Sequence, residues 1–239
     1  MSKTAQAGDG DIDGHVARSA LFGQLPPECR QAVVGRLQRV TVEAGQLIFS
    51  RGDPGTELYL VIEGRVRISI VSLDGRELAF DHSTPGTIFG EIAVLDGATR
   101  SASATALTRC QTMKLSRAAL LDLMVKHHEI AQAMIVFLCA RLRDVSDQLE
   151  EIALLPVEVR VARYLARLLG GAGKGKEGQT AGTQRLRLDV SQTELGFLLG
   201  ASRQKINAAL ASLEAQGALH RDGDALECLP DILRRIADA

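Results

Sequence analysis

The stretch GEIAVLDGATRSA, from Gly90 to Ala102, places an acid and an arginine nine residues apart around an apolar run. Glycine allows a sharp turn before Glu91, and a short helical turn starting there would point main-chain amides outward as anion donors. Arg100 adds a full positive charge with fork geometry, and Ser101 adds a hydroxyl. The stretch therefore predicts a pocket for a singly charged phosphate.

A cyclic nucleotide suits such a pocket because it combines a phosphate monoanion with a free ribose hydroxyl. Glu91 can accept a hydrogen bond from that hydroxyl while Arg100 compensates its charge, and the amides of Ile92 and Ala93 can donate to the phosphate. Charge-assisted hydrogen bonds of this kind contribute about 1.5–3 kcal/mol each. The residues alone leave one alternative open, a strand-turn-strand with an exposed Arg–Glu pair of almost no energetic consequence.

The surrounding residues, 40–115, show the near-alternation and β-branched content of strands, separated by Gly, Asp and Pro. Asp74-Gly75 lies between two apolar runs and predicts a hairpin. We expect an antiparallel barrel or sandwich, because glycines recur every 11 or 12 residues, a spacing typical of successive short strands and turns. These glycines are Gly52, Gly64, Gly75, Gly86 and Gly97.

A long helical sequence without Gly or Pro follows, from the candidate N-cap Ser116 to Pro156, which ends it. Its later part carries apolar residues in a 3-4 alternation, which favours two helices packed lengthwise and therefore a homodimer. The alternative is a single helix that lies on its own domain, which needs a similar stripe. The apolar seam consists of Ile135, Leu138, Leu142, Val145, Leu149 and Ile152.

A second motif near the C-terminus predicts a helix-turn-helix. Ser191 and Glu194 form a capping box, Gly200 allows a tight turn, and Ser202 can cap a second helix. A hairpin around Asp222-Gly223 would form a wing, whereas the alternative is a helical hairpin that only packs. The second helix begins with side chains that can donate to bases or phosphates. They are Arg203, Gln204, Lys205 and Asn207.

Composition excludes several other classes of function. The 239 residues are 46% hydrophobic with a net charge of −1, and residues 157–239 hold 12 Lys/Arg against 10 Asp/Glu, so charge alone does not indicate DNA binding. The four cysteines form no ligand-spaced pair, and we expect no metal site. Because we find no nucleophile–base pair or P-loop, we expect no enzyme activity. No signal sequence or membrane span is recognisable, so we expect a cytoplasmic protein without membrane contact.

The stretch from Gly90-Glu91 to Arg100-Ser101-Ala102 resembles the phosphate-binding cassette of cyclic-nucleotide-binding domains. Together with the β-rich region, the heptad helix and the winged helix-turn-helix, it makes the chain similar to the Crp/Fnr transcription factors over roughly residues 20–230. The resemblance implies an α+β fold with an N-terminal, jelly-roll-like β-roll effector domain, a long dimerisation helix and a C-terminal winged helix-turn-helix. We expect a disordered tail at 1–15, the β-roll at 16–125, the helix and hinge at 126–156, and the DNA-binding domain at 157–239.

The resemblance also implies roles for individual residues. Gly90 would form the turn, Glu91 would bind the ribose, and Arg100 and Ser101 would bind the phosphate together with the amides of Ile92 and Ala93. Alignment places Val145-Ser146 where cAMP-responsive members contact the adenine with a Thr-Ser pair. Because Val145 lacks a hydroxyl, the base stays open, and the effector is expected to be cAMP or cGMP.

For the DNA-binding half, the resemblance implies that Arg203 reads a guanine in a near-palindromic, double-stranded site, with Ser202, Gln204, Lys205 and Asn207 beside it. Many members carry Glu after this Arg and a second Arg later, where this chain has Gln204 and Ala208. RNA polymerase is an expected partner. The rival interpretation is a ligand-independent regulator whose β-roll serves only dimerisation or polymerase contact.

Overall fold

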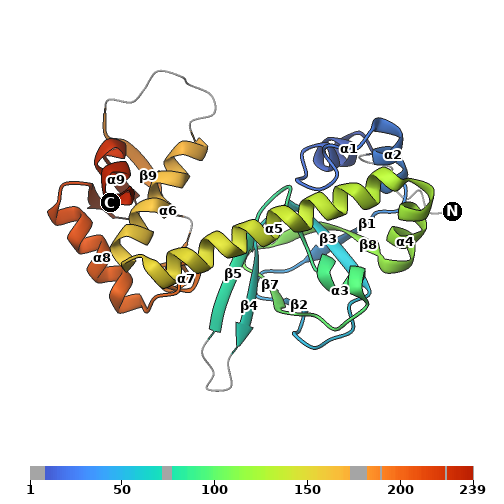
Figure 1. Ribbon diagram of the computed structural model, residues 1–239, viewed down its shortest axis with the longest axis horizontal. Coiled ribbons are helices and arrows are strands. Elements are labelled where there is room, and N and C mark those ends of the chain that lie inside the picture. The colour runs from blue at the N-terminus through green and yellow to red at the C-terminus, as the bar shows by residue number, and fades with distance from the viewer. Residues whose placement is uncertain (1–8, 72–76, 173–181, 189, 224, 239) are drawn as a thin grey trace. The chain divides into compact units, whose positions relative to one another are not determined.

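A computed structural model of the protein divides into two compact units, Met1–Arg143 and Asp144–Ala239 (Figure 1). It combines a β-rich N-terminal region, a long helix and a C-terminal helix-turn-helix with a small β-wing, which confirms the predicted α+β fold class. The boundaries predicted for the domains stay predictions. The structure describes residues 9–71, 77–172, 182–188, 190–223 and 225–238.

In the described part of the first unit, two short helices are followed by eight strands, which one helical turn interrupts, and by two further helices. In chain order these elements are α1 (Asp9–Ala17), α2 (Pro27–Val34), β1 (Gln38–Val42), β2 (Leu47–Phe49), β3 (Glu57–Glu63), β4 (Val66–Val71), β5 (Glu77–Ser83), β6 (Ile88–Phe89), α3 (Glu91–Asp96), β7 (Ser103–Ala106), β8 (Cys110–Ser116), α4 (Arg117–Lys126) and α5 (His128–Leu154). Helix α5 continues into the second unit.

The strands form two four-stranded antiparallel sheets, with the orders β1-β8-β3-β6 and β2-β7-β4-β5. Strand β3 shows the two-residue period of a strand that is covered on both faces. Its Tyr59 and Val61 pack in one cluster with residues of β2, β4 and β7, whereas Leu58 and Leu60 pack in another cluster with the helices. The predicted hairpin at Asp74-Gly75 lies outside the described residues, although β4 and β5 do pair on either side of it.

Helix α1 corrects the expectation of a disordered tail over residues 1–15. The helix begins at Asp9, while residues 1–8 lie outside the described part of the chain. Ile12 and the fully buried Val16 lie one helical turn apart and pack against the core formed with β3 and β8. Burial of this small apolar face therefore outweighs the poor helix propensity of a segment rich in Gly and Asp.

The helical sequence after the β-roll is divided at His127, whose backbone (φ −134°, ψ 94°) is extended. Ser116 caps α4 as predicted, because its hydroxyl accepts from the Ala119 amide at 3.2 Å. Among the described residues, no single helix has the length and apolar content needed to cross a membrane. Helices α4 and α5 meet those criteria only when taken together across a 117° bend.

The apolar seam of α5 does not face the core of the first unit. The residues of α5 that are buried there are Ile130 and Met134. In contrast, Leu142 is 67% exposed, and Ile135, Val145 and Leu149 are exposed as well. These exposed seam residues are therefore not packed on the β-roll of the same chain, and the homodimer stays a prediction.

The second unit packs its helices around a small three-stranded antiparallel sheet of order β10-β11-β9. In chain order its elements are α6 (Val157–Ala172), β9 (Gln184–Arg187), α7 (Gln192–Leu198), α8 (Arg203–Ala215), β10 (Leu219–Asp222), β11 (Ala225–Cys228) and α9 (Pro230–Ala237). Its core is built by residues that are nearly or fully buried, among them Val161, Leu165, Leu195, Ile206, Leu210, Leu213 and Leu233.

Candidate functional site

Gly90 sets the geometry at the start of α3. Its backbone is left-handed (φ 76°), and a Cβ atom at this position would lie 2.7 Å from Nη1 of Arg100 and 3.4 Å from the Glu57 carbonyl oxygen. A side chain is therefore disfavoured both by conformation and by space. The predicted helical turn is present as α3, and it begins at Glu91, which is 3% exposed.

Arg100 reaches this turn from the segment before β7, and it is only 3% exposed. Its Nη1 donates to the Gly90 carbonyl oxygen at 2.7 Å, and its Nη2 donates to the Glu57 carbonyl oxygen at 2.6 Å. The guanidinium carbon lies 4.1 Å from the ring centroid of Phe49, a cation–π contact. The third nitrogen, Nε, is buried and has no hydrogen-bond partner. The side chain is thus held inside the β-roll with its Nε–H left without an acceptor.

Burial lowers the pKa of the Arg100 guanidinium, while Tyr59, Glu57, Asp53 and Glu91 act in the opposite direction. An arginine starts from so high a pKa that it stays charged inside a protein. A buried cation surrounded by main-chain carbonyls and an aromatic ring favours an anionic partner.

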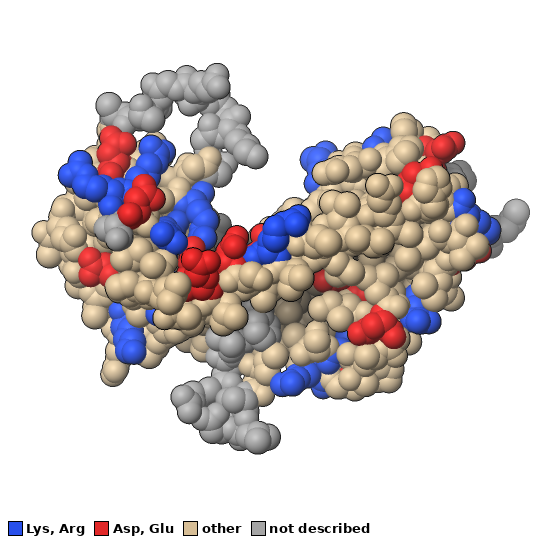
Figure 2. Space-filling model, in the orientation of Figure 1, with Lys and Arg blue, Asp and Glu red and all other residues tan. Residues whose placement is uncertain are grey.

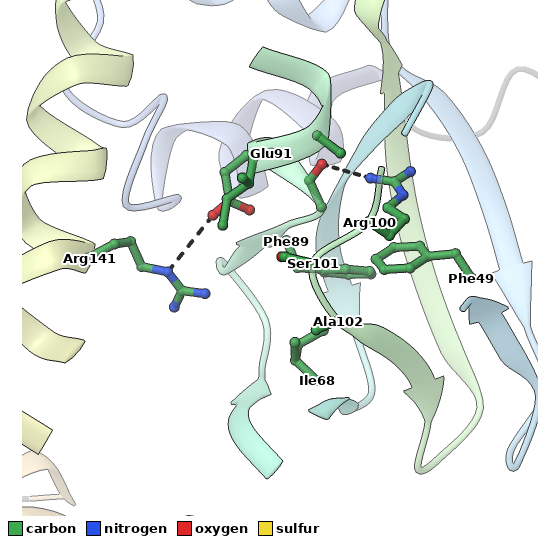
Figure 3. Close-up of a pocket in the computed structure, with 11 residues that line it drawn as sticks. Phe49, Ile68, Phe89, Glu91, Arg100, Ser101, Ala102 and Arg141 are labelled. Carbon is green, nitrogen blue, oxygen red and sulfur yellow. Dashed lines mark hydrogen bonds and ion pairs between the residues drawn. The ribbon is translucent and has the colours of Figure 1, made fainter. Parts of the chain in front are cut away.

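The cassette residues enclose a pocket together with residues of the strands and of α5 (Figure 3). Arg141 on α5 approaches the pocket, with Nε 3.9 Å from Oε1 of Glu91. The cavity measures about 50 Å³, whereas ligand sites for small molecules span roughly 300–1,000 Å³. A nucleotide therefore fits only if the lining moves or part of the ligand stays outside the enclosed space. The lining of this cassette pocket consists of Phe49, Ile68, Phe89, Gly90, Glu91, Ile92, Ala93, Arg100, Ser101, Ala102 and Arg141.

The structure brings together the cassette residues named by the sequence. Gly90, Glu91, Ile92, Ala93, Arg100 and Ser101 all line the cassette pocket. Val145 and Ser146 lie on α5 in the second unit, beyond Arg141, and Val145 is 59% exposed. Their predicted contact with a base stays a prediction.

Sequence reasoning missed the apolar wall of the pocket and the role of Arg141. Phe89 stacks on Tyr59, with ring centroids 5.2 Å apart, and Phe49 lies tilted 6.0 Å from both rings. The Phe49 ring supports the Arg100 guanidinium. No local signal marks these aromatic residues, because they lie on three separate strands. The heptad pattern alone puts Arg141 on the solvated flank of the helix, yet its side chain is only 36% exposed and faces Glu91.

The second candidate site is the start of α8. The Ser191 hydroxyl accepts from the Glu194 amide at 3.2 Å, and the Glu194 carboxylate accepts from the Ser191 amide at 2.7 Å, so the predicted capping box at the start of α7 is present. Ser202 caps α8 by accepting from the Lys205 amide at 3.3 Å. Gly200 between the two helices is left-handed (φ 61°), as the turn requires.

The first turn of α8 presents its polar side chains to solvent. Arg203, Gln204 and Lys205 are exposed and Asn207 is half-buried, whereas Ile206 points into the core. The strands β10 and β11 pair on either side of Gly223 and form the predicted wing. Basic and acidic side chains alternate on the face of this unit seen in Figure 2, so no uniformly positive surface marks that face.

Comparisons with known proteins assign the two regions that hold these candidate sites to known domain families. Residues 39–127 match the family model of the cyclic nucleotide-binding domain, and residues 159–234 match that of the Crp-like helix-turn-helix domain. The chain is 32% identical over 212 residues to the CRP-like cAMP-activated global transcriptional regulator of Mycobacterium tuberculosis, an alignment that covers 89% of this chain and 93% of the relative.

Solved structures agree with this assignment. The catabolite activator protein of Thermus thermophilus is 30% identical, with a TM-score of 0.53, over 92% of this chain and 99% of that chain. The c-di-GMP responsive global regulator of Xanthomonas campestris is 28% identical, with a TM-score of 0.68, over 85% and 99% of the two chains.

The chain therefore belongs to the Crp/Fnr family, as a transcription regulator with a cyclic-nucleotide-binding domain and a Crp-like helix-turn-helix. The helix-turn-helix implies DNA binding. Members of this family regulate transcription and are not enzymes, which agrees with the expectation from the sequence.

Proposed function

We propose that the protein is a homodimeric transcription factor controlled by a cyclic nucleotide, cAMP or cGMP, which binds in the cassette pocket. The single observation that carries the proposal is the buried guanidinium of Arg100, whose Nε lacks a hydrogen-bond partner beside Glu91. In this role the protein acts in the cytoplasm, binds near-palindromic DNA and contacts RNA polymerase.

The unpaired Nε of Arg100 supports the proposal of a phosphate site. A buried donor without a partner is unfavourable, and a bound anion would remove this penalty by accepting its hydrogen bond. A phosphate oxygen that reaches Nε would supply the acceptor that this nitrogen lacks. One that also meets Nη1 or Nη2 would give Arg100 a charged acceptor in place of the neutral Gly90 or Glu57 carbonyl oxygen, and Arg–phosphate pairs of this kind are frequently bidentate. The amides of Ile92 and Ala93 and the hydroxyl of Ser101 complete the proposed phosphate site.

Glu91 supports the ribose half of the proposal. Its carboxylate lies in the same pocket as Arg100 and would accept a hydrogen bond from a ribose hydroxyl, while the two nearby arginines keep a buried acid tolerable. Arg141 approaches Glu91 in the narrow pocket, so we infer that nucleotide entry displaces or reorients Arg141. Several relatives are named cAMP-activated, which makes cAMP the first ligand to test. We propose Val145 and Ser146 as the residues nearest the base.

The exposed seam of α5 supports the homodimer. A parallel pair of α5 helices would cover Leu142, Val145 and Leu149, burying large apolar side chains whose transfer from water contributes about 1.5–3 kcal/mol each. A dimer also supplies two copies of α8, and two half-sites one helical turn apart on one DNA duplex would match its symmetry.

Leu142→Glu is expected to convert the dimer to a monomer at micromolar concentration, because it places a like charge at the same level of both helices. Analytical ultracentrifugation gives the mass directly. Val125→Glu is the matched control, since Val125 is even more exposed (87%) but lies on α4, away from the seam. A Leu142→Glu protein that still sediments as a dimer would show that dimerisation uses another surface.

The function is tested by measuring DNA affinity with and without ligand at fixed salt. Selection from a random duplex library supplies the DNA site, and titration with cAMP, cGMP or c-di-GMP follows. We expect cAMP or cGMP to tighten binding about 5- to 150-fold, the range of typical coupling free energies of 1–3 kcal/mol. Equal affinity with and without every nucleotide would favour the rival function, a constitutive regulator whose β-roll serves only dimerisation or polymerase contact.

A further inference from the structure

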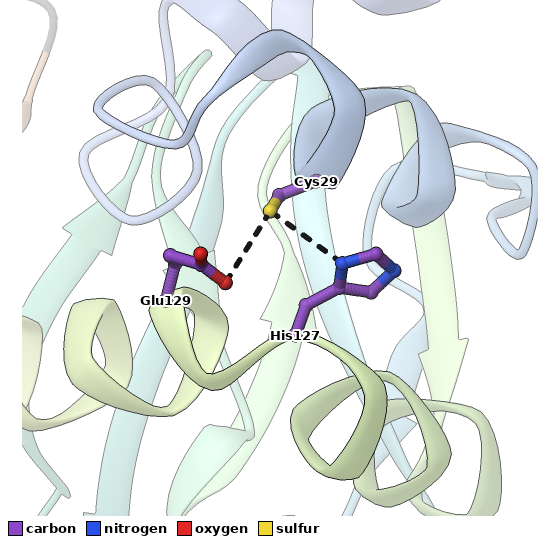
Figure 4. A group of neighbouring side chains, drawn as sticks. All are labelled: Cys29, His127 and Glu129. Carbon is purple, nitrogen blue, oxygen red and sulfur yellow. Dashed lines mark hydrogen bonds between the residues drawn. The ribbon is translucent and has the colours of Figure 1, made fainter.

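Three side chains that can bind a metal ion converge outside the cassette pocket, where α2 meets the junction of α4 and α5 (Figure 4). Cys29 projects from α2, His127 occupies the break between the two helices, and Glu129 lies in the first turn of α5. The Cys29 Sγ lies 3.7 Å from the His127 Nδ1 and 3.7 Å from the Glu129 Oε2. All three ligand atoms lie within 4.8 Å of one another.

We propose that Cys29, His127 and Glu129 form a binding site for a borderline-soft divalent cation of the Zn²⁺ class. Thiolate, imidazole and carboxylate are the three ligand types that zinc takes in proteins, and sites with three protein ligands keep a fourth position for water. The site is separate from the cassette pocket, and its argument does not depend on nucleotide binding.

The spacing of the three atoms is close to that of a tetrahedral zinc site. With Zn–S of about 2.3 Å and Zn–N or Zn–O of about 2.0–2.1 Å, the sulfur-to-nitrogen and sulfur-to-oxygen edges of a tetrahedron measure about 3.5 Å. Both observed edges from the Cys29 Sγ are 3.7 Å. Side-chain rotation of His127 or Glu129 suffices to shorten the remaining edge, because both side chains are partly exposed while Cys29 is fully buried.

Hydrogen bonding can hold the three groups together only in one protonation pattern. The Cys29 thiol donates to the Glu129 carboxylate, so its contact with His127 requires the Nδ1–H tautomer of that imidazole to donate to Sγ. A cation would accept a lone pair from each of the three groups. The charges also balance, since a thiolate and a carboxylate together neutralise a divalent ion. Binding forms one S–Zn bond, breaks the S–H bond of Cys29 and releases one proton to solvent.

Oxidative chemistry at Cys29 is the less favoured role for this thiol. Burial and the nearby Glu129 carboxylate raise the pKa of Cys29, which keeps the thiol protonated and unreactive at neutral pH. No other cysteine belongs to the cluster among the described residues, so a disulfide partner is missing there. Metal binding needs no such partner and overcomes the raised pKa by displacing the proton.

The proposal is tested on the full chain, stripped with a chelator under reducing conditions and titrated with ZnCl₂ against a chromophoric competitor. We expect one tightly bound Zn²⁺ per chain, a rise in Tm on binding, and a thiolate-to-cobalt charge-transfer band when Co²⁺ replaces Zn²⁺. Cys29→Ser and His127→Gln should each weaken binding by about 100-fold or more, since even indirect partners of a metal contribute 10- to 100-fold.

Two matched controls separate this site from adventitious binding. His128→Gln removes a neighbouring histidine that is 88% exposed, and Cys139→Ser removes the exposed cysteine of α5. Both should bind Zn²⁺ as the unaltered chain does. The proposal is overturned if Cys29→Ser and the unaltered chain bind equally, if the cobalt band is missing, or if His128→Gln loses as much affinity as His127→Gln. His127→Gln keeps the test valid should Cys29→Ser fail to fold.

Discussion

Replacing Arg100 with alanine is expected to weaken binding of cAMP or cGMP by about 10²- to 10⁴-fold. Arg100 would make two charge-assisted hydrogen bonds to the phosphate, each worth about 1.5–3 kcal/mol, and every 1.4 kcal/mol changes affinity tenfold. A neutral water molecule in the space left by the side chain would not replace the charge of the guanidinium, which is 3% exposed in the wild-type protein. Isothermal titration calorimetry on the purified dimer measures the affinity directly.

The control for this experiment must address folding, because Arg100 also donates to the Gly90 and Glu57 carbonyls. Its removal destabilises the β-roll as well, so the unfolding transition of each variant is recorded alongside the titration. Arg51→Ala removes an exposed arginine and should bind normally, while Ser101→Ala, which removes one proposed hydrogen bond to the phosphate, should lose about tenfold or more. A folded Arg100→Ala protein with unchanged affinity would refute the assignment of the phosphate site.

The helix-turn-helix could be predicted from the sequence because its signals are local. Ser191 and Glu194 are three residues apart, and the hydrogen bonds between them depend only on the first turn of one helix. The same holds for Ser202 and the amide of Lys205. A capping residue fixes where a helix begins, and a left-handed glycine fixes where it ends. The sequence therefore specifies the boundaries of both helices and the turn between them without information from distant residues.

The cassette pocket was predictable only in part. The wall proposed to face the phosphate comes from one short segment of the chain. The pattern of glycine, acid and arginine in that segment was enough to predict it. The opposite wall is assembled from Phe49, Ile68 and Phe89 on separate strands and from Arg141 on α5. Their proximity depends on strand register and on how α5 crosses the β-roll. A heptad pattern shows which face of α5 is apolar, but not which flanking arginine meets Glu91.

Two further features, the helix break at His127 and the cluster around Cys29, depend on long-range packing. No local sequence pattern predicted either of them. No proline or glycine marks the break at His127, yet helices α4 and α5 are bent by 117° relative to one another there. Cys29 and His127 are 98 residues apart, so the spacing rules for cysteine motifs could not join them. The cluster exists because α2 and the helix break are packed against the same sheet.

Arg203→Ala is expected to weaken binding to the preferred DNA site by about 2–6 kcal/mol, or roughly 30-fold to 10⁴-fold. A bidentate contact between arginine and guanine discriminates by about 1–3 kcal/mol, and the proposed dimer would make it once in each half-site. The side chain is exposed in the first turn of α8, whose direction Ser202 fixes by its cap. Fluorescence anisotropy with the selected duplex, at fixed salt, measures the loss.

What distinguishes base reading from charge attraction is the ratio of specific to non-specific affinity. Arg203→Ala should lower that ratio, whereas Lys205→Ala, which removes a proposed partner of a DNA phosphate, should weaken both kinds of binding and reduce the salt slope by about 1 for each phosphate that is no longer neutralised. Arg235→Ala removes an exposed arginine of α9 and should change neither. If Arg203→Ala lowered specific and non-specific binding by the same factor, Arg203 would contact the backbone, and the guanine would have to be read by another side chain of α8.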